Sequence, residues 1–113
     1  IAVAPDAFDA FFRDFGAQGF VGGNVTIPHK EAAFRLADEV TERGRRLEAV
    51  NTLWREDGRV IADNTDAFGF IAHLDQTLGP DWADGTSTAL ALGAGGAARA
   101  VVAGLLDRGL DRI

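Results

Sequence analysis

Apolar residues recur along the chain in two patterns, one typical of helices and one typical of strands. Phenylalanines within residues 8–15 recur at i, i+3, i+4 and i+7, which predicts a first helix with Asp6 as its N-cap. Residues 20–27 form a short apolar run that predicts a buried strand, and Pro28 ends it. The next apolar periodicity predicts a second helix over residues 28–40.

The middle of the chain carries the pattern of a short helix followed by a hairpin. Residues 41–47 predict the helix. Two apolar stretches, residues 50–55 and 60–62, flank Asp57 and Gly58, a pair that tolerates the left-handed backbone of a tight hairpin turn. We therefore expect two antiparallel strands here.

The last third of the chain returns to long elements. Residues 67–78 predict a helix, and residues 88–92 predict a compact strand that leads directly into a glycine-rich turn. The helix after the turn should bury its apolar face (Ala98, Val101, Val102, Leu105 and Leu106), and residues 111–113 resemble the entry to a further strand. Alternation of strands and helices predicts an α/β fold with parallel pairing.

Composition narrows the class of protein. The chain has 113 residues, 47% of them hydrophobic, a net charge of −6 and no cysteine. These values exclude a disulfide scaffold and a thiolate metal site, and they predict neither a nucleic-acid nor a membrane partner. His29 and His73 lack a second ligand at metal spacing, so we expect no metal. Because the chain opens at Ile1 without methionine, we expect a piece of a longer protein.

Gly93, Gly95 and Ala98 form a G-x-G-x-x-A turn between the predicted strand and helix. The first glycine permits a tight turn, the second lets a pyrophosphate approach the backbone, and the small third residue permits close packing. The free N–H groups at the helix start then supply a local anion site in an acidic protein. The alternative is a glycine-rich turn that binds nothing. The turn alone does not separate NAD from NADP.

Polar residues interrupt the apolar pattern at three further places. Lys30 stands at a predicted helix start, where a cation opposes the helix dipole unless an anion lies nearby. Asn51 lies in an apolar stretch where asparagine is disfavoured, and Asp66 precedes an apolar-periodic helix. The plain alternatives are a solvated lysine, an edge residue facing water, and a helix N-cap.

Taken together and in order, these segments resemble the shikimate dehydrogenase family. The segments that carry the resemblance are Gly23-Asn24-Val25-Thr26-Ile27-Pro28-His29-Lys30, Ala49-Val50-Asn51-Thr52, Asn64-Thr65-Asp66 and Gly93-Ala94-Gly95-Gly96-Ala97. This chain departs from the family at three positions. The family commonly has glycine where this chain has Glu48 and Ala62, and alanine where it has Gly44, but none of these residues carries chemistry. The family interconverts shikimate and 3-dehydroshikimate with NADP, on the route to chorismate and the aromatic amino acids.

The resemblance implies a role for each matching residue. Lys30 would be the catalytic lysine and Asp66 its carboxylate partner, and both would contact the substrate together with Thr26 and Asn51. The cofactor diphosphate would lie on the glycine turn, that is on Gly93, Ala94, Gly95, Gly96 and Ala97, and Glu42 matches a position sometimes linked to the cofactor.

The resemblance also implies an architecture. Residues 1–66 would be most of an α/β substrate domain, and residues 67–113 a linker helix with the first strand and helix of a Rossmann-like NADP domain. We expect a cytoplasmic monomer or homodimer whose partner is a small molecule, and no turnover by the 113 residues alone. The alternatives are a quinate/shikimate dehydrogenase using NAD or NADP, a non-catalytic shikimate-sensing relative, and a plain dinucleotide-binding module.

Overall fold

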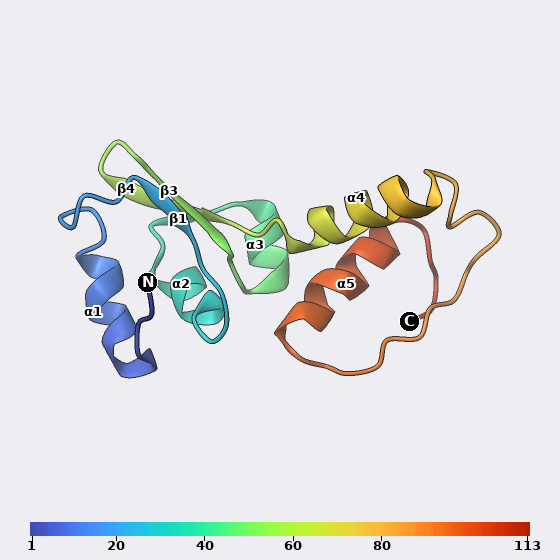
Figure 1. The fold of residues 1–113 in the computed structure, drawn as a ribbon, viewed down its shortest axis with the longest axis horizontal. Coiled ribbons are helices and arrows are strands. Elements are labelled where there is room, and N and C mark those ends of the chain that lie inside the picture. Colours follow the sequence, from blue (N-terminus) through green and yellow to red (C-terminus); the bar gives the residue numbers. More distant parts are fainter. The chain divides into compact units, whose positions relative to one another are not determined.

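The chain divides into two units along the sequence. A computed structural model describes residues 1–113, with Gly96 described by its backbone alone. Unit 1 comprises Ile1–Thr65 and unit 2 comprises Asp66–Ile113 (Figure 1). Each unit is described below by itself. None of the helices that the structure describes combines the length and the apolar character needed to span a membrane.

Unit 1 is built around one small mixed sheet. Its helical elements are η1 (Pro5–Ala7), α1 (Phe8–Arg13), α2 (Lys30–Leu36) and α3 (Glu42–Leu47), and its strands are β1 (Gly22–Asn24), β2 (Glu39–Val40), β3 (Thr52–Glu56) and β4 (Arg59–Asp63). The strand order is β1-β3-β4-β2. β3 pairs antiparallel with both β1 and β4, and only β2 pairs parallel with β4. The expected parallel pairing is therefore present only between β2 and β4, and the predicted antiparallel hairpin lies at the centre of the sheet.

The β3–β4 hairpin turns at the residues that the sequence predicts. Asp57 has φ 50° and Gly58 has φ 81°, the positive values that a tight two-residue hairpin turn requires. The turn fixes the register, so that Glu56 pairs with Arg59 and Thr52 pairs with Asp63. The first residue of β3 thus lies beside the last residue of β4.

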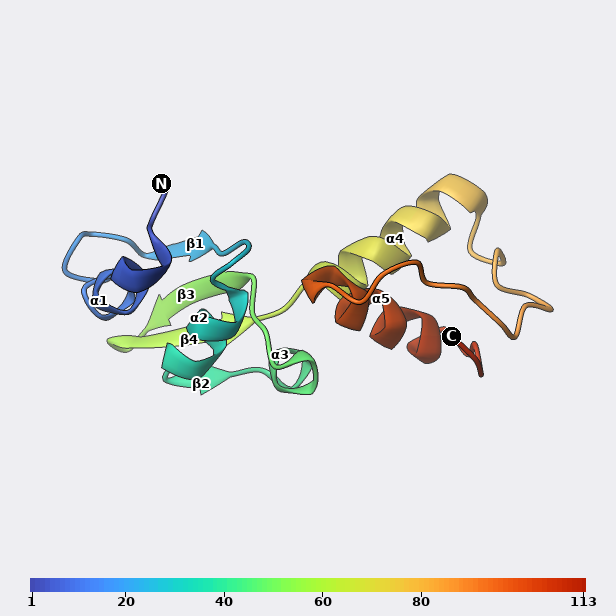
Figure 2. The same cartoon turned by 90° about the horizontal axis from the view of Figure 1, so that it is seen from below.

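The core of unit 1 lies between the sheet and two helices. Helices α1 and α2 cover one face of the sheet (Figures 1 and 2). Phe8 and Phe12 of α1 and Ala33 of α2 are buried against Leu53 and Ala62, which are paired across the hairpin. Burial of a phenylalanine side chain contributes about 1.5–3 kcal/mol, so the predicted phenylalanine face of α1 anchors this helix.

Strand β1 is shorter and more exposed than the sequence predicts. The apolar run over residues 20–27 contributes only Gly22–Asn24 to the sheet, and Val21 and Ile27 are 81% and 69% exposed. The reason is that β1 is an edge strand, paired only with β3 among the described residues. One side of β1 therefore has no neighbouring strand among the described residues.

Two predicted helix boundaries in unit 1 are wrong. Helix α2 begins at Lys30 because Pro28 lies in a turn, in which His29 N–H donates to the Thr26 carbonyl at 2.9 Å. The helix ends at Leu36, and Val40, predicted to be helical, instead pairs with β4 in strand β2. At the N-terminus, Asp6 lies inside η1 and does not cap α1 through its side chain.

Unit 2 consists of two helices that pack closely. Helix α4 (Asp66–Leu78) and helix α5 (Gly96–Asp107) approach at Gly104, where an added Cβ would lie 2.9 Å from Cγ1 of Ile71. Leu105 of α5 is buried as predicted, whereas Leu106 is 46% exposed. The absent side chain at Gly104 is what permits the close packing.

The predicted strand over residues 88–92 forms only one bridge. Thr88 pairs in parallel with Arg112, and Ala89 N–H donates to the Arg112 carbonyl at 2.9 Å. Leu90 and Leu92 are 85% and 92% exposed. No other described residue pairs with this segment, so residues 88–92 do not form a strand of a sheet. The parallel bridge across α5 nevertheless has the connectivity of a strand–helix–strand unit.

Candidate active site

The backbone of residues 50 and 51 joins three other segments at one end of the sheet. Val50 N–H donates to the Lys30 carbonyl at 3.1 Å, and Asn51 N–H donates to the Asp63 carbonyl at 2.9 Å. The Asn51 carbonyl in turn accepts from Val25 N–H at 2.8 Å. The end of β1, the start of α2 and the end of β4 are therefore each held at residues 50 and 51 by a main-chain bond, and the Asn24 side chain adds a bond to the Asn51 carbonyl at 3.3 Å.

The turn between β1 and α2 carries two of the predicted site residues. Thr26 is exposed, and its carbonyl accepts from His29 N–H at 2.9 Å. The His29 ring stacks on Phe8 at 4.3 Å between centroids, and its Nε2 lies 2.8 Å from the Val3 carbonyl. Lys30, half-buried, is the first residue of α2. Anchoring of His29 thus fixes the turn on which Thr26 and Lys30 stand.

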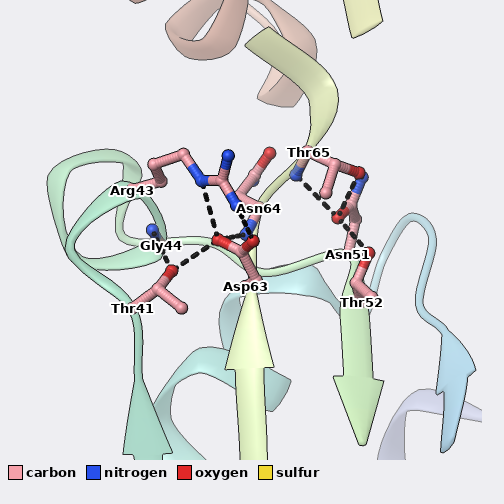
Figure 3. A network of polar contacts seen from close by, with 8 residues as sticks. All are labelled: Thr41, Arg43, Gly44, Asn51, Thr52, Asp63, Asn64 and Thr65. Atoms are coloured by element: carbon pink, nitrogen blue, oxygen red, sulfur yellow. Dashed lines mark hydrogen bonds and ion pairs between the residues drawn. The ribbon is translucent and has the colours of Figure 1, made fainter. Parts of the chain in front are cut away.

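The side-chain amide of Asn51 is oriented by two threonines (Figure 3). Its Oδ1 accepts from Thr65 N–H at 3.0 Å and from the Thr52 hydroxyl at 2.9 Å. The Thr65 hydroxyl lies 3.2 Å from both Oδ1 and Nδ2 of Asn51. Asn51 precedes β3 and is half-buried. It is therefore a positioned polar group and not an edge residue that merely faces water.

Asp63, the last residue of β4, collects a second set of donors (Figure 3). Its carboxylate accepts from the Thr41 hydroxyl, from Arg43 Nε at 3.3 Å and Nη2, and from Asn64 N–H at 2.7 Å. Thr41 also caps helix α3 by accepting from Gly44 N–H at 3.3 Å. One carboxylate thus connects the end of β4 to the start of α3.

Asp63 is 5% exposed, and its carboxyl remains ionised. Burial raises its pKa, but hydrogen bonds from Arg43, Thr41 and Asn64 N–H, together with the Arg43 charge, outweigh burial and lower the pKa below its ordinary value. Arg43 is itself 59% exposed, so the ion pair is open to water on the arginine side.

Asp63 and Arg43 were not singled out from the sequence, and Thr65 was noted only as part of the Asn64-Thr65-Asp66 motif, without a role of its own. The apolar stretch of residues 60–62 runs directly into Asp63 and Asn64, and only the structure shows that both polar residues are buried. Residues 61–64 are all buried, although two of the four are polar. A charged residue that continues a buried run needs partners. The identity of those partners, 20 and 22 residues away, was not visible in the local pattern.

The glycine turn in unit 2 has the form of an anion site. Gly93 has φ 118°, a value that favours glycine, and Gly95 precedes α5 in an extended conformation. No described atom outside the neighbouring residues lies within 4 Å of where a Cβ of either glycine would stand. The first N–H groups of a helix lack intrahelical acceptors, and no side chain of the described residues caps α5. These residues fit a diphosphate.

The catalytic role of Asp66 and the cofactor role of Glu42 stay predictions. Asp66 opens α4, in its first turn and not ahead of it, and therefore belongs to unit 2. Glu42 is exposed at the start of α3 in unit 1, whereas the glycine turn is in unit 2. Among the described residues, no group of three or more His, Cys, Asp or Glu side chains has the arrangement of a metal site.

Comparison with known proteins identifies the family. A sequence model described as the shikimate dehydrogenase substrate binding domain matches residues 1–53. The chain is 61% identical, over 98% of its length, to a shikimate dehydrogenase (NADP(+)) of Methylobacterium radiotolerans. It is 58% identical, over 96% of its length, to the enzyme of the same name from Methylocella silvestris. The chain belongs to the shikimate dehydrogenase family.

A solved structure of the family supports the α/β fold. The shikimate 5-dehydrogenase of Thermus thermophilus, solved in complex with NADP(H) and shikimate, is similar with a TM-score of 0.79 and 35% identity. The match covers 97% of this chain and 40% of that one. The chain likewise spans 40% and 39% of the length of the two relatives named above. The resemblance seen in the motifs is confirmed at the level of family and fold.

Proposed function

We propose that the whole protein containing this chain catalyses the reversible, NADP-dependent reduction of 3-dehydroshikimate to shikimate, in the biosynthesis of chorismate and the aromatic amino acids. The observation that carries the proposal is the main-chain frame that gathers Thr26, Lys30 and Asn51 at one end of the sheet in unit 1. The relatives that are 54–61% identical and named shikimate dehydrogenase (NADP(+)) support the same reading.

Lys30 is assigned the proton transfer. Reduction of a ketone by hydride leaves an alkoxide, and the Lys30 ammonium donates the proton that converts it to the alcohol. In the reverse direction, neutral Lys30 accepts the hydroxyl proton as the hydride leaves, so oxidation is favoured at high pH. Asp66 is assigned the role of its carboxylate partner, because an opposite charge favours the ionised lysine.

Thr26 and Asn51 are assigned to the substrate hydroxyls. Thr26 is exposed at the end of β1, and its side chain has a donor and an acceptor. The Asn51 amide is held by Thr65 and Thr52, so its orientation is set before a ligand arrives. Preorganised polar groups bind a polyhydroxylated ring with less loss of side-chain entropy.

The glycine turn is assigned to the cofactor. Gly93, Ala94, Gly95, Gly96 and Ala97 would hold the diphosphate of NADP at the start of α5, with Glu42 at a further cofactor contact. When bound, the nicotinamide supplies the hydride. The protein residues supply position and protons.

The proposal includes the organisation of the whole protein. Residues 1–66 belong to the substrate domain, and residues 67–113 are a linker helix and the opening strand and helix of the dinucleotide domain. We expect a cytoplasmic monomer or homodimer that acts on a small molecule. Size-exclusion chromatography with light scattering measures the oligomeric state.

Lys30→Ala in the whole protein tests the function. We expect kcat for NADP-dependent shikimate oxidation to fall by ~10² or more, the scale of general acid–base catalysis, with an unchanged far-UV circular dichroism spectrum. Arg45→Ala is the matched control, because it removes an exposed cation on α3 and should leave kcat unaltered. An unchanged kcat in Lys30→Ala would sink the role of Lys30. Comparing shikimate with quinate turnover separates the proposal from a broader quinate/shikimate activity.

A further inference from the structure

Unit 1 contains a second polar concavity at the end of the sheet away from Asn51. The cavity measures about 510 Å³ and is lined by residues of α1, α2 and the β3–β4 hairpin. Three arginines line it, one from each of these elements: Arg13, Arg35 and Arg55. Asn51 precedes the first residue of β3, whereas Arg55 lies near its other end, beside the hairpin turn. We call this concavity the basic cavity.

The guanidinium groups of the basic cavity have no carboxylate partner. Among the residues that the structure describes, no ion pair or side-chain hydrogen bond involves Arg13, Arg35 or Arg55, and all three are exposed. Asp38 is the one acidic residue in the described lining, and its carboxylate accepts from Val60 N–H at 2.7 Å. In a chain of net charge −6, three uncompensated arginines around one cavity need an explanation.

Helix termini explain part of this arrangement. Arg13 and Arg35 each lie in the last turn of a helix, where a cation offsets the partial negative charge of the helix end. That effect does not account for Arg55, which lies on a strand. Two helix ends of about half a charge each, together with Asp38, still leave the cavity with a net positive charge of about one unit.

Arg55 is packed in a way that depends on a glycine. A Cβ added to Gly16 would lie 2.5 Å from Cζ of Arg55, so the guanidinium rests directly over the Gly16 backbone. Both residues line the basic cavity. The absence of a side chain at position 16 therefore leaves the space that the Arg55 guanidinium occupies.

We propose that the basic cavity binds a small multivalent oxyanion. Guanidinium groups form paired, charge-assisted hydrogen bonds with phosphate and carboxylate oxygens, and several of them converging on one space select an anion with more than one charge. The volume falls within the range of about 300–1,000 Å³ that small-molecule pockets occupy. The site is separate from the residues assigned to substrate and cofactor, and the proposal does not depend on that assignment.

Calorimetric titration of the whole protein tests the proposal. The protein is first saturated with NADP+ and 3-dehydroshikimate, both in their oxidised forms so that no turnover occurs, and the other anion-binding residues are thereby occupied. Inorganic pyrophosphate and citrate are then titrated separately, which distinguishes a phosphate site from a carboxylate site. We expect saturable binding of at least one of these probes, weakened about tenfold in Arg13→Gln and in Arg35→Gln, as expected for the loss of one charge-assisted hydrogen bond.

Two further variants separate a built site from general charge attraction. Arg45→Gln removes an exposed arginine outside the cavity and should bind both probes as the wild type does. Gly16→Ala retains all three charges but displaces the Arg55 guanidinium, so we expect it to weaken binding as well. Equal affinities in all variants, a loss in Arg45→Gln equal to that in Arg35→Gln, or no binding of either probe at millimolar concentration would overturn the proposal.

Discussion

Asp63→Asn probes the carboxylate that joins β4 to α3. The substitution keeps the shape of the side chain, removes its charge and replaces one acceptor with a donor. The remaining oxygen can still accept from Asn64 N–H, the Thr41 hydroxyl and Arg43 Nε, which all bond one carboxylate oxygen, while the new amide faces Nη2 of Arg43. The network in Figure 3 would therefore lose its charge-assisted bonds but not its volume.

The size of the effect follows from burial. Hydrogen bonds to a charged group contribute about 1.5–3 kcal/mol each, and Asp63 is only 5% exposed, so water cannot replace them on its side. Arg43 is 59% exposed and regains water when its partner is neutral, which reduces the loss. We expect the free energy of unfolding to fall by about 2 kcal/mol, a change of about 30-fold in the folding equilibrium.

The pH dependence of this effect has a definite sign. The pKa of Asp63 is lower in the folded state than its ordinary value, so its contribution to stability is complete above the ordinary carboxyl pKa of about 3.9. That contribution is lost as pH falls through the folded pKa. The stability difference between wild type and Asp63→Asn should be constant from about pH 7 to pH 5 and should shrink below about pH 4.

Urea denaturation of the whole protein, followed by far-UV circular dichroism at several pH values, measures the difference. Glu39→Gln is the matched control, because the Glu39–Arg59 pair has a 3.2 Å separation but both side chains are at least half exposed. We expect the control to cost about 0.5 kcal/mol or less. A loss in Asp63→Asn no larger than in Glu39→Gln, or one undiminished at acid pH, would refute the argument.

Two further predictions concern Asn51 and the packing of unit 2. Thr65→Val removes the hydroxyl that lies 3.2 Å from both polar atoms of the Asn51 amide, and we expect KM for shikimate to rise several-fold, with Thr65→Ser close to wild type in steady-state kinetics. Gly104→Ala places a methyl group 2.9 Å from Cγ1 of Ile71 and should destabilise the protein by about 1–3 kcal/mol in thermal denaturation. Gly69→Ala, in an open position on α4, should instead be neutral or stabilising by up to about 1 kcal/mol; equal effects of the two glycine variants would contradict this.

Sequence patterns predicted the elements whose cause is local. The phenylalanine face of α1, the Asp57–Gly58 turn and the short helix after Thr41 are all present. Each depends on residues within one helical turn or one hairpin. Thr41, for example, caps α3 by accepting from the N–H three residues later. Interactions at such short range leave a readable trace in the sequence.

Elements that depend on distant partners were predicted less well. The existence of β2, the exposure of β1 and the missing ladder at residues 88–92 are decided by which strands lie alongside. Val40 illustrates the point, since its spacing continues the apolar pattern of α2 while its backbone pairs with β4. Periodicity does not encode the identity of the neighbouring strand.

The candidate site divides in the same way. Lys30, Asn51 and Asp66 were singled out because they belong to motifs with a family resemblance, although as an isolated residue each also had a plain interpretation. Asp63 and Arg43 were missed because a carboxylate at the end of a strand gains its meaning from donors some 20 residues earlier. Only the folded structure brings these groups together.

The main-chain bonds around Asn51 have a consequence for how this site can evolve. Val25, Lys30 and Asp63 are tied to residues 50 and 51 through backbone atoms, which every amino acid except proline supplies equally. The spacing between these segments therefore does not depend on a substrate-facing side chain such as that of Thr26. A new ring substituent on the substrate could be accommodated by replacing one side chain, without rebuilding the scaffold that carries it.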